Sequence, residues 1–197
     1  MTTYKRDIAL IQWCEKNKIH FVEHLQQGVF RGIKNRRDWL KKWDHLMNEP
    51  IQAVPLKKDI LVCEREINKL EDKMNRVKLE VAPHPLRQVG GSEFALRYLN
   101  SFFKKRYQNY QKHISKPDLS RRSCSRLSPY LAFCNLSMRQ VLQKTEYESA
   151  KGNKRFALKA FVSRLRWQSH FIQKFEMECS MESVSYTHLT LPTNREV

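Results

Sequence analysis

Hydrophobic residues in this chain recur mostly three and four positions apart, which is the spacing of helices that bury one face. The pattern predicts a short helix over residues 7–17 and a longer amphipathic helix over residues 59–80. It predicts further helices starting near residues 92, 128 and 137, and a last one that carries Trp167. The chain is therefore predicted to be mainly α-helical.

One stretch departs from helical spacing. Apolar residues alternate between Ile19 and Phe30, which predicts a strand with a turn at Gly28. A helix followed by a strand is typical of the end of an α/β layer, so residues 1–35 are interpreted as the remnant of a Rossmann-like α/β domain. A single strand cannot form a sheet that buries its own faces.

Residues 36–89 are predicted to connect this remnant to a helical domain. They begin with dense charge around Trp39 and Trp43, and Pro50 and Pro55 interrupt the pattern. The helix over residues 59–80 carries a heptad-like apolar stripe. A coiled-coil partner is one interpretation. A helix packed across a domain junction is favoured, because sustained coiled coils need more heptads.

The helical domain is predicted to cover residues 90–182 and to open at Gly90-Gly91, with Ser92 as the N-cap of its first helix. Ser137 and Gln140 have the spacing of a capping box at the start of a later helix. The helical spacing after Ser92 predicts four buried residues in the first helix: Ala95, Leu99, Phe102 and Phe103.

A serine-rich loop lies in the middle of this domain. Hydroxyl groups at Ser123, Ser125 and Ser128 surround Arg126, and Ser128-Pro129 is a typical N-cap followed by the first residue of a helix. Free N–H groups at a helix start, with hydroxyls and a guanidinium beside them, suit a phosphate. The alternative is an ordinary serine-rich helix entry without a ligand.

The charge of the chain points to an anionic partner. Its 37 basic and 20 acidic residues give a formal charge of +17. Lys104 to Arg126 holds eight basic residues and one acid, and Lys151 to Phe175 holds seven basic residues and no acid. Two such segments, both rich in aromatic residues, favour a nucleic-acid surface over merely solvated helix faces.

The five cysteines lie at 14, 63, 124, 134 and 179, without C-x-x-C spacing or a zinc pattern, so we expect free thiols and no metal site. No apolar run approaches the length of a membrane span, and the first residues lack the apolar core of a secretory signal. These features predict a cytoplasmic protein without a membrane partner, and we expect a monomer.

Three motifs in order carry a family resemblance: G-G-S-E-F-A-L from Gly90, S-R-L-S-P-Y-L-A-F from Ser125, and the helix with Trp167. In this order and spacing, residues 90–180 resemble the first half of the flavin-binding domain of the DNA photolyase and cryptochrome family. The resemblance implies a helical FAD-binding domain, and residues 1–35 resemble the end of that family's α/β antenna domain. In the complete protein it also implies an antenna chromophore, either folate or deazaflavin.

The resemblance also implies site residues, and no catalytic side chain is among them. In the family, the serine loop and an upstream tyrosine hold the FAD phosphates. Tyr110 is the better match for that tyrosine and Tyr107 the second choice. The FAD contacts implied for this chain are Tyr110, Ser123, Cys124, Ser125, Arg126, Leu127 and Ser128.

For DNA containing UV lesions, the resemblance places Trp167 in the cavity that accepts a flipped base, where an aromatic wall replaces lost stacking. Its helix supplies five candidate DNA contacts: Arg164, Trp167, Gln168, His170 and Phe171.

Several residues depart from the family pattern. Cys134 stands where glycine is usual, and a left-handed conformation there would cost cysteine about 1 kcal/mol. Cys124 replaces a hydroxyl residue. Arg164 and Gln168 stand where many members have glutamate and arginine. These departures affect the expected lesion preference more than flavin binding.

We interpret the chain as an internal fragment of a light-driven deoxyribodipyrimidine photolyase, inactive alone because the second half of the flavin clamp is missing. A cryptochrome-type light sensor and a flavin-free basic module that binds nucleic acid are the alternatives. The Thr-rich residues 183–197 resemble a translated adapter sequence, so this non-native tail is excluded from the fold prediction.

Overall fold

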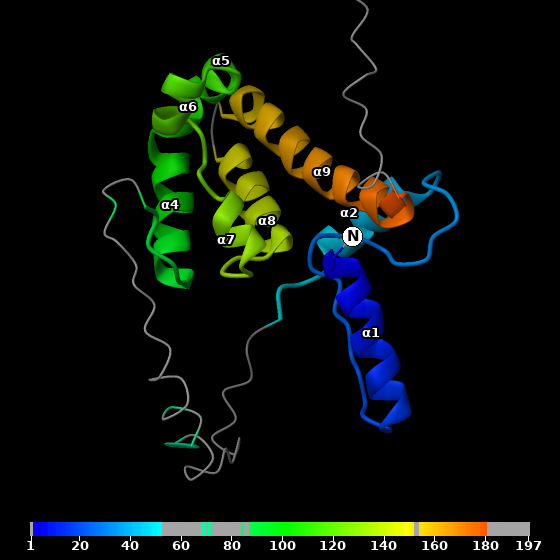
Figure 1. The fold of residues 1–197 in the computed structure, drawn as a ribbon. Coiled ribbons are helices and arrows are strands. Elements are labelled where there is room, and N and C mark those ends of the chain that lie inside the picture. The colour runs from blue at the N-terminus through cyan, green and yellow to red at the C-terminus, as the bar shows by residue number, and fades with distance from the viewer. Residues whose placement is uncertain are drawn as a thin grey trace, which may run out of the picture.

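The computed structural model describes residues 2–52, 68, 69, 71, 84, 87–151 and 154–180, and the fold is given for these alone. No strand occurs among them, so the mainly helical class is confirmed for this part of the chain (Figure 1). The elements are α1 (Thr2–Lys16), α2 (Trp39–Asn48), α4 (Ser92–Lys104), the 3-10 helix η1 (Arg106–Asn109), α5 (Tyr110–His113), α6 (Pro117–Ser123), α7 (Ser128–Ala132), α8 (Met138–Ala150) and α9 (Arg155–Met177). The predicted helix over 59–80 falls almost entirely outside the described residues, and the tail over 183–197 falls wholly outside them.

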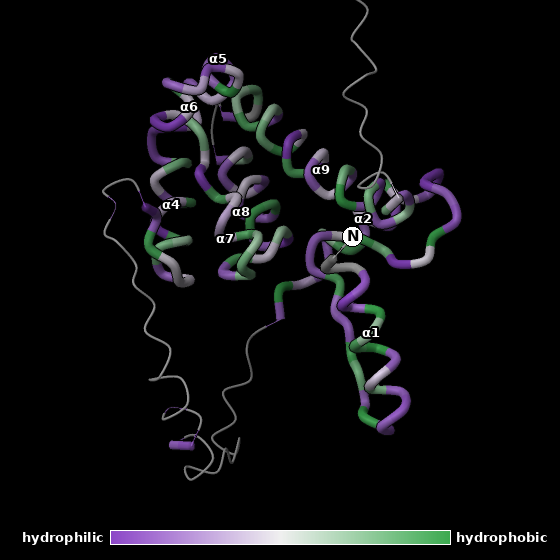
Figure 2. The backbone as a smooth tube through the Cα atoms, viewed as in Figure 1, coloured by the Kyte–Doolittle hydropathy of each residue, from purple (hydrophilic) through white to green (hydrophobic). Residues whose placement is uncertain are grey.

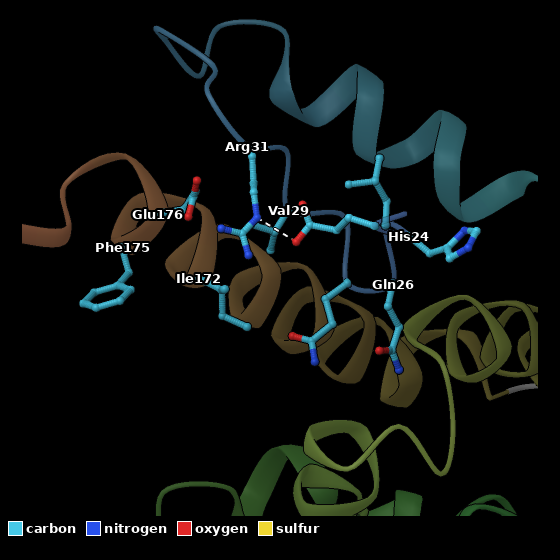
Figure 3. Close-up of a pocket in the computed structure, with 10 residues that line it drawn as sticks. His24, Gln26, Val29, Arg31, Ile172, Phe175 and Glu176 are labelled. Atoms are coloured by element: carbon cyan, nitrogen blue, oxygen red, sulfur yellow. Dashed lines mark hydrogen bonds and ion pairs between the residues drawn. The ribbon is translucent and has the colours of Figure 1, made fainter. Parts of the chain in front are cut away.

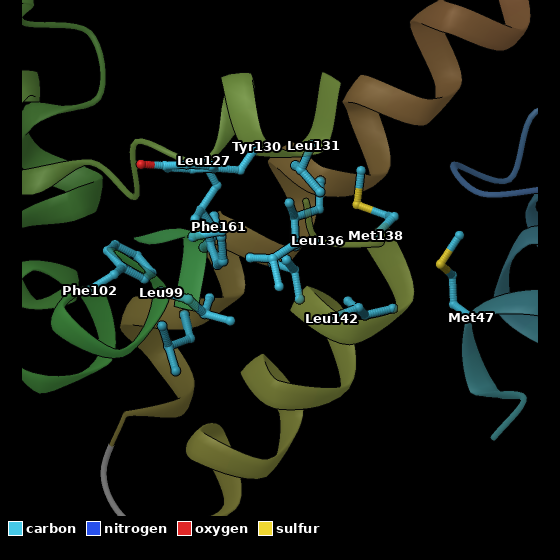
Figure 4. Packing of buried hydrophobic residues seen from close by; sticks show 14 of the residues in the cluster. Met47, Leu99, Phe102, Leu127, Tyr130, Leu131, Leu136, Met138, Leu142 and Phe161 are labelled. Atoms are coloured by element: carbon cyan, nitrogen blue, oxygen red, sulfur yellow. The ribbon is translucent and has the colours of Figure 1, made fainter. Parts of the chain in front are cut away.

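The hydrophobic core lies between α4, α7, α8 and α9 (Figure 4). Green and purple residues alternate along α1, α4 and α9 in Figure 2, as expected of helices with one apolar face. The ring of Phe102 on α4 lies 4.7 Å from that of Phe161 on α9, measured between centroids. The buried residues of α4 are the four that the sequence predicts: Ala95, Leu99, Phe102 and Phe103.

Helix α2 was not predicted, and it belongs to the same core. Trp39, Trp43 and Met47 are spaced four residues apart and are all buried, with α2 packed against α8. Trp39 Nε1 donates a hydrogen bond to the Gly28 carbonyl at 3.0 Å. Gly28 has a φ of 68°, and a Cβ added there would lie 2.2 Å from Trp43 Cδ1. The predicted turn at Gly28 is therefore present, and only glycine fits beneath the indole.

The predicted strand over residues 19–30 is wrong. Residues 19–25 have no regular secondary structure and residues 26–28 form a bend. Phe30 N–H donates to Gln173 Oε1 on α9 at 2.6 Å, and Gln173 Nε2 donates to the Phe30 carbonyl at 2.9 Å. A strand needs a neighbouring strand to pair its backbone groups. In the described ranges none is present, and a buried amide from α9 pairs the Phe30 backbone instead.

Three predicted helix ends can be compared with the structure. The capping box is confirmed, because Ser137 Oγ accepts from Gln140 N–H and the Gln140 side chain accepts from Ser137 N–H. Ser92 and Ser128 are the first residues of α4 and α7, so both N-cap predictions are wrong by one position. The actual N-caps are Gly91 and Leu127, neither of which has a capping side chain.

Candidate phosphate pocket and basic helix face

The serine loop runs from the end of α6 to the start of α7, and two buried side chains hold its ends. Ser123 is buried and lies 2.7 Å from His113 Nδ1, within hydrogen-bonding distance. Leu127 is buried in the hydrophobic core. Because these two side chains point inward, the residues between them form the surface of the loop.

A pocket of about 480 Å³ opens over this surface. Five of the seven predicted FAD contacts line it: Tyr110, Cys124, Ser125, Arg126 and Ser128. The structure does not place Ser123 or Leu127 in the lining. Tyr107, the second-choice tyrosine, is also absent from it. Tyr110 precedes the other four residues by 14 to 18 positions in the sequence. It lies beside them because α5 packs against α6.

Two polar residues of the pocket were missed by sequence reasoning. Ser120 lies on α6, one turn before Ser123, and helical spacing from the serine loop would have indicated it. Gln88 lies 38 residues before Arg126, and its Nε2 donates to the Arg126 carbonyl at 2.8 Å. No local signal in the sequence could have found this contact.

Arg106 of η1 holds the loop from behind. Its Nη2 donates to the Tyr98 carbonyl at 2.6 Å and to Ser101 Oγ at 2.8 Å on α4, and to the Ser125 carbonyl at 3.4 Å. Its Nη1 donates to the Cys124 carbonyl. One guanidinium thus joins the serine loop to α4, which a planar fork of five donors can do and a lysine cannot.

The backbone of the loop is unusual at Arg126, whose φ is 63°. This left-handed conformation is uncommon outside glycine. The bond from Gln88 to the Arg126 carbonyl and the burial of Leu127 maintain it. The result is that Arg126 lines the pocket although its neighbour Leu127 is buried.

Burial determines the protonation of two pocket residues. It raises the pKa of Tyr110, with the neighbouring Cys124 adding to the effect and Arg164 opposing it. It also raises the pKa of the Cys124 thiol, against the opposing charges of Arg106 and Arg126. Both groups therefore stay protonated at neutral pH. The pocket offers an anion neutral donors and one guanidinium, with no carboxylate among the described residues that line it.

Three of the predicted DNA contacts share one exposed face of α9. Arg164, Trp167 and Phe171 are three and then four residues apart. The Arg164 guanidinium lies 5.3 Å from the centroid of the Trp167 ring, and the Trp167 and Phe171 rings meet edge-on at 5.8 Å. Trp167 is 53% exposed and Phe171 57%, so neither serves as core packing.

The other two predicted contacts lie differently. His170 packs edge-on against Trp39 at 5.4 Å, and its Nε2 lies 3.0 Å from Arg36 Nη1. It therefore joins α9 to the chain before α2. Gln168 is half-buried.

The exposed face of α9 begins close to the pocket. α5, which carries Tyr110, packs against α9, and the Tyr110 ring meets Phe161 edge-on at 5.5 Å. Arg164, one turn further along, is near enough to oppose the rise in the Tyr110 pKa. The two groups of residues that the sequence singled out are thus neighbours.

Another cavity, of about 220 Å³, lies between residues 23–31 and the end of α9, where Ile172 and Phe175 line it (Figure 3). Arg31 binds Glu23 at 2.7 Å and Asp7 at 3.5 Å. Its charge is therefore already neutralised, whereas the Arg126 side chain has no ion pair among the described residues.

None of the helices in the described ranges combines the length and hydropathy that a bilayer crossing requires. Nor does this part of the chain gather three or more His, Cys, Asp or Glu side chains that would hold a metal ion. No family model, no curated protein and no solved structure matches the chain.

Proposed function

We propose that this chain belongs to a photolyase-type flavoprotein, in which the pocket at the serine loop holds the diphosphate of FAD. The observation that carries the proposal is the convergence of five residues around one pocket: Tyr110, Cys124, Ser125, Arg126 and Ser128. All five are residues that the sequence predicts as FAD contacts. In the fragment interpretation, residues 1–35 are the end of the antenna domain and residues 90–182 the first part of the flavin domain.

The donors of the pocket fit a diphosphate. Tyr110, Ser125 and Ser128 line it with Arg126, and each of the three carries a hydroxyl; Ser120 also lines it, but its hydroxyl donates to the Pro117 carbonyl at 2.9 Å. Hydrogen bonds to a phosphate are charge-assisted and about twice as strong as neutral ones. A volume of about 480 Å³ accommodates a diphosphate with part of its nucleoside. When bound, the flavin supplies electron-transfer chemistry, and the residues of this chain bind and orient its phosphates.

We further propose that the exposed face of α9 binds DNA that carries a UV lesion. An exposed tryptophan can stack on a base that has left the duplex, which contributes about 1–3 kcal/mol. Arg164 above the indole, with the other basic residues of α9, attracts the phosphates on either side. The reaction proposed for the complete protein is light-driven splitting of pyrimidine dimers.

The flavin proposal is tested by titrating the full chain with FAD and with FMN, which lacks the diphosphate bridge and the adenosine, and following flavin fluorescence polarisation. We expect FAD to bind and FMN to bind at least tenfold more weakly. Ser125→Ala with Ser128→Ala should weaken FAD binding by about tenfold to a hundredfold, because two charge-assisted bonds are lost. Ser115→Ala, at an exposed serine away from the pocket, is the matched control. Equal affinity for FAD and FMN, or no uptake of FAD, would contradict the proposal.

The DNA proposal is tested with a duplex containing one cyclobutane dimer and the same duplex undamaged. Trp167→Ala should remove the preference for the damaged duplex, a loss of about five-fold or more from the stacking energy. Phe156→Ala is the control, because Phe156 is a more exposed aromatic residue of α9 that lies about three turns before Trp167, outside the Arg164–Phe171 cluster. Equal losses in the two variants would contradict the assignment of Trp167.

The second candidate function is a flavin-free module that binds nucleic acid. The exposed Arg164–Trp167–Phe171 face favours it, since base stacking on a basic helix needs no flavin. Duplex binding without any uptake of FAD in the two titrations would select this candidate.

A further inference from the structure

A second pocket, of about 300 Å³, lies on the other side of Arg126 from the phosphate pocket. Tyr98 and Ser101 of α4 form part of its lining. No acidic residue lines it in the part of the chain that the structure describes. The rest of the lining is five arginines: Arg87, Arg106, Arg121, Arg122 and Arg126.

Among the described residues, Arg106 alone of these five arginines finds hydrogen-bond acceptors for its guanidinium. Arg106 donates to four acceptors around the serine loop and α4, as described above. The side chains of the other four make no hydrogen bond or ion pair with any described residue. Several other arginines do pair with carboxylates: Arg31 with Glu23, Arg97 with Glu93 and Arg139 with Glu49.

The field in this pocket is therefore positive and uncompensated. Burial lowers the pKa of Arg106, and the charge of Arg126 lowers it further. Like charges in one concave site repel one another, and an anion bound between them removes that repulsion. Guanidinium forks match the oxygens of a phosphate in pairs, so phosphate is the anion that this geometry suits best.

We propose that this arginine pocket binds the phosphodiester backbone of nucleic acid, separately from the flavin diphosphate in the neighbouring pocket. The inference rests on the nucleic-acid part of the proposed function. Arg87, Arg121 and Arg122 are exposed, and exposed cations hold a single small phosphate weakly because water and salt screen them. A polymer binds such cations more strongly, because each phosphate contact releases condensed counterions.

The placement of arginines on both sides of the phosphate pocket supports a polymer as the ligand. Arg126 is a wall of both pockets, and Tyr110 lines the phosphate pocket beyond it. The charge of Arg164 on α9 opposes the rise in the pKa of Tyr110, and its guanidinium lies over the Trp167 ring. Basic side chains thus lie on both sides of Tyr110, at the arginine pocket and on the exposed face of α9. α5, α6 and the upper end of α9 lie together in Figure 1.

The test uses the full chain with Arg121→Gln and Arg122→Gln together. Binding of a labelled undamaged duplex is followed by fluorescence anisotropy over a series of potassium chloride concentrations. Each phosphate contact contributes about 0.9 to the slope of log K against log salt, so the slope should become shallower by about 1.8. The matched control is Lys16→Gln with Lys42→Gln, which removes the same charge from exposed residues of α1 and α2. We expect its slope to change by less than about 0.5.

Two further measurements separate the outcomes. Circular dichroism in urea should give all variants the same midpoint, because the substituted side chains are exposed and form no hydrogen bond or ion pair with described residues. FAD titration should give the arginine variant the same affinity as the unchanged chain. If FAD is not taken up at all but the slopes differ as expected, the flavin proposal fails and the arginine pocket stands.

Three results would overturn the inference. The first is an equal change of slope in the arginine and lysine variants, which would mean that only net charge matters. The second is loss of FAD or inorganic pyrophosphate binding in the arginine variant with an unchanged duplex slope, which would assign the pocket to a small anion. The third is failure of the unchanged chain to bind duplex, which would also remove the nucleic-acid part of the proposed function.

Discussion

Replacing Arg106 by lysine tests whether the fold holds the serine loop in its binding shape. Arg106→Lys keeps the positive charge but replaces a planar fork by a single ammonium group. In the structure, one guanidinium reaches carbonyls of Tyr98, Cys124 and Ser125 and the hydroxyl of Ser101. The lysine side chain is shorter, so its ammonium group can form a hydrogen bond with about one of these four acceptors.

The size of the effect follows from the bonds that are lost. A hydrogen bond from a charged group contributes about 1.5–3 kcal/mol when fully buried. Arg106 is only half-buried, so we discount each bond to about 1 kcal/mol. Loss of two or three bonds then lowers the free energy of unfolding by about 2–3 kcal/mol.

The assay is urea denaturation followed by circular dichroism, together with FAD titration. Arg106 does not line the phosphate pocket, so any fall in FAD affinity reports the shape of the serine loop. Arg97→Lys is the matched control, since Arg97 forms an exposed pair with Glu93 one turn away at 2.7 Å. Such a pair contributes about 0.3–0.5 kcal/mol.

The reasoning would be refuted if Arg106→Lys and Arg97→Lys had equal free energies of unfolding within about 0.5 kcal/mol. Equal FAD affinity in the two variants, with Arg106→Lys destabilised as expected, would refute a narrower claim. In that case Arg106 would stabilise α4 without shaping the pocket.

Two further substitutions test particular features of the fold. Cys134 is exposed and has a φ of 59°, a conformation that glycine adopts more easily than cysteine. Cys134→Gly should therefore raise the free energy of unfolding by about 0.5–1 kcal/mol, measured by thermal denaturation. Cys134→Ala keeps the Cβ and should show no gain. Gln173→Leu removes the amide that pairs both backbone groups of Phe30, so it should lower the free energy of unfolding by about 2–4 kcal/mol in urea denaturation. The control is Gln168→Leu, at a half-buried residue about one and a half turns away, which should lower it by less than about 1 kcal/mol. A stable Gln173→Leu protein would mean that water pairs Phe30 without loss.

Several features of the fold could be predicted because they depend on neighbours in the chain. The buried face of α4 follows from the spacing of Ala95, Leu99, Phe102 and Phe103, and the capping box from Ser137 and Gln140 three residues apart. The left-handed residue after α7 was predicted at Cys134 from the position of a glycine in the family pattern, and it is present. In each case the contact that decides the conformation lies within one or two helical turns.

Other features were missed because their partners are distant in sequence. The alternation from Ile19 to Phe30 predicted a strand, but a strand forms only where another strand supplies hydrogen bonds. Trp39 and Trp43 were predicted to lie in a connector. They are buried in the core because Gly28, α8 and α9 pack around them, and these partners are distant in sequence. Gln88 was missed because its hydrogen bond to the Arg126 carbonyl joins residues 38 positions apart in the sequence.

The sequence by itself determined that the chain is helical and basic, with hydroxyls and an arginine gathered in one loop. Tertiary structure decided which of those groups face a common pocket, turning Ser123 and Leu127 inward and bringing Tyr110 and Gln88 beside the rest. Tertiary structure also brings together, around one pocket, four arginines whose side chains form no hydrogen bond or ion pair with the described residues. The physical reason is that helical periodicity is a local property, whereas the convergence of charge depends on which helices pack together.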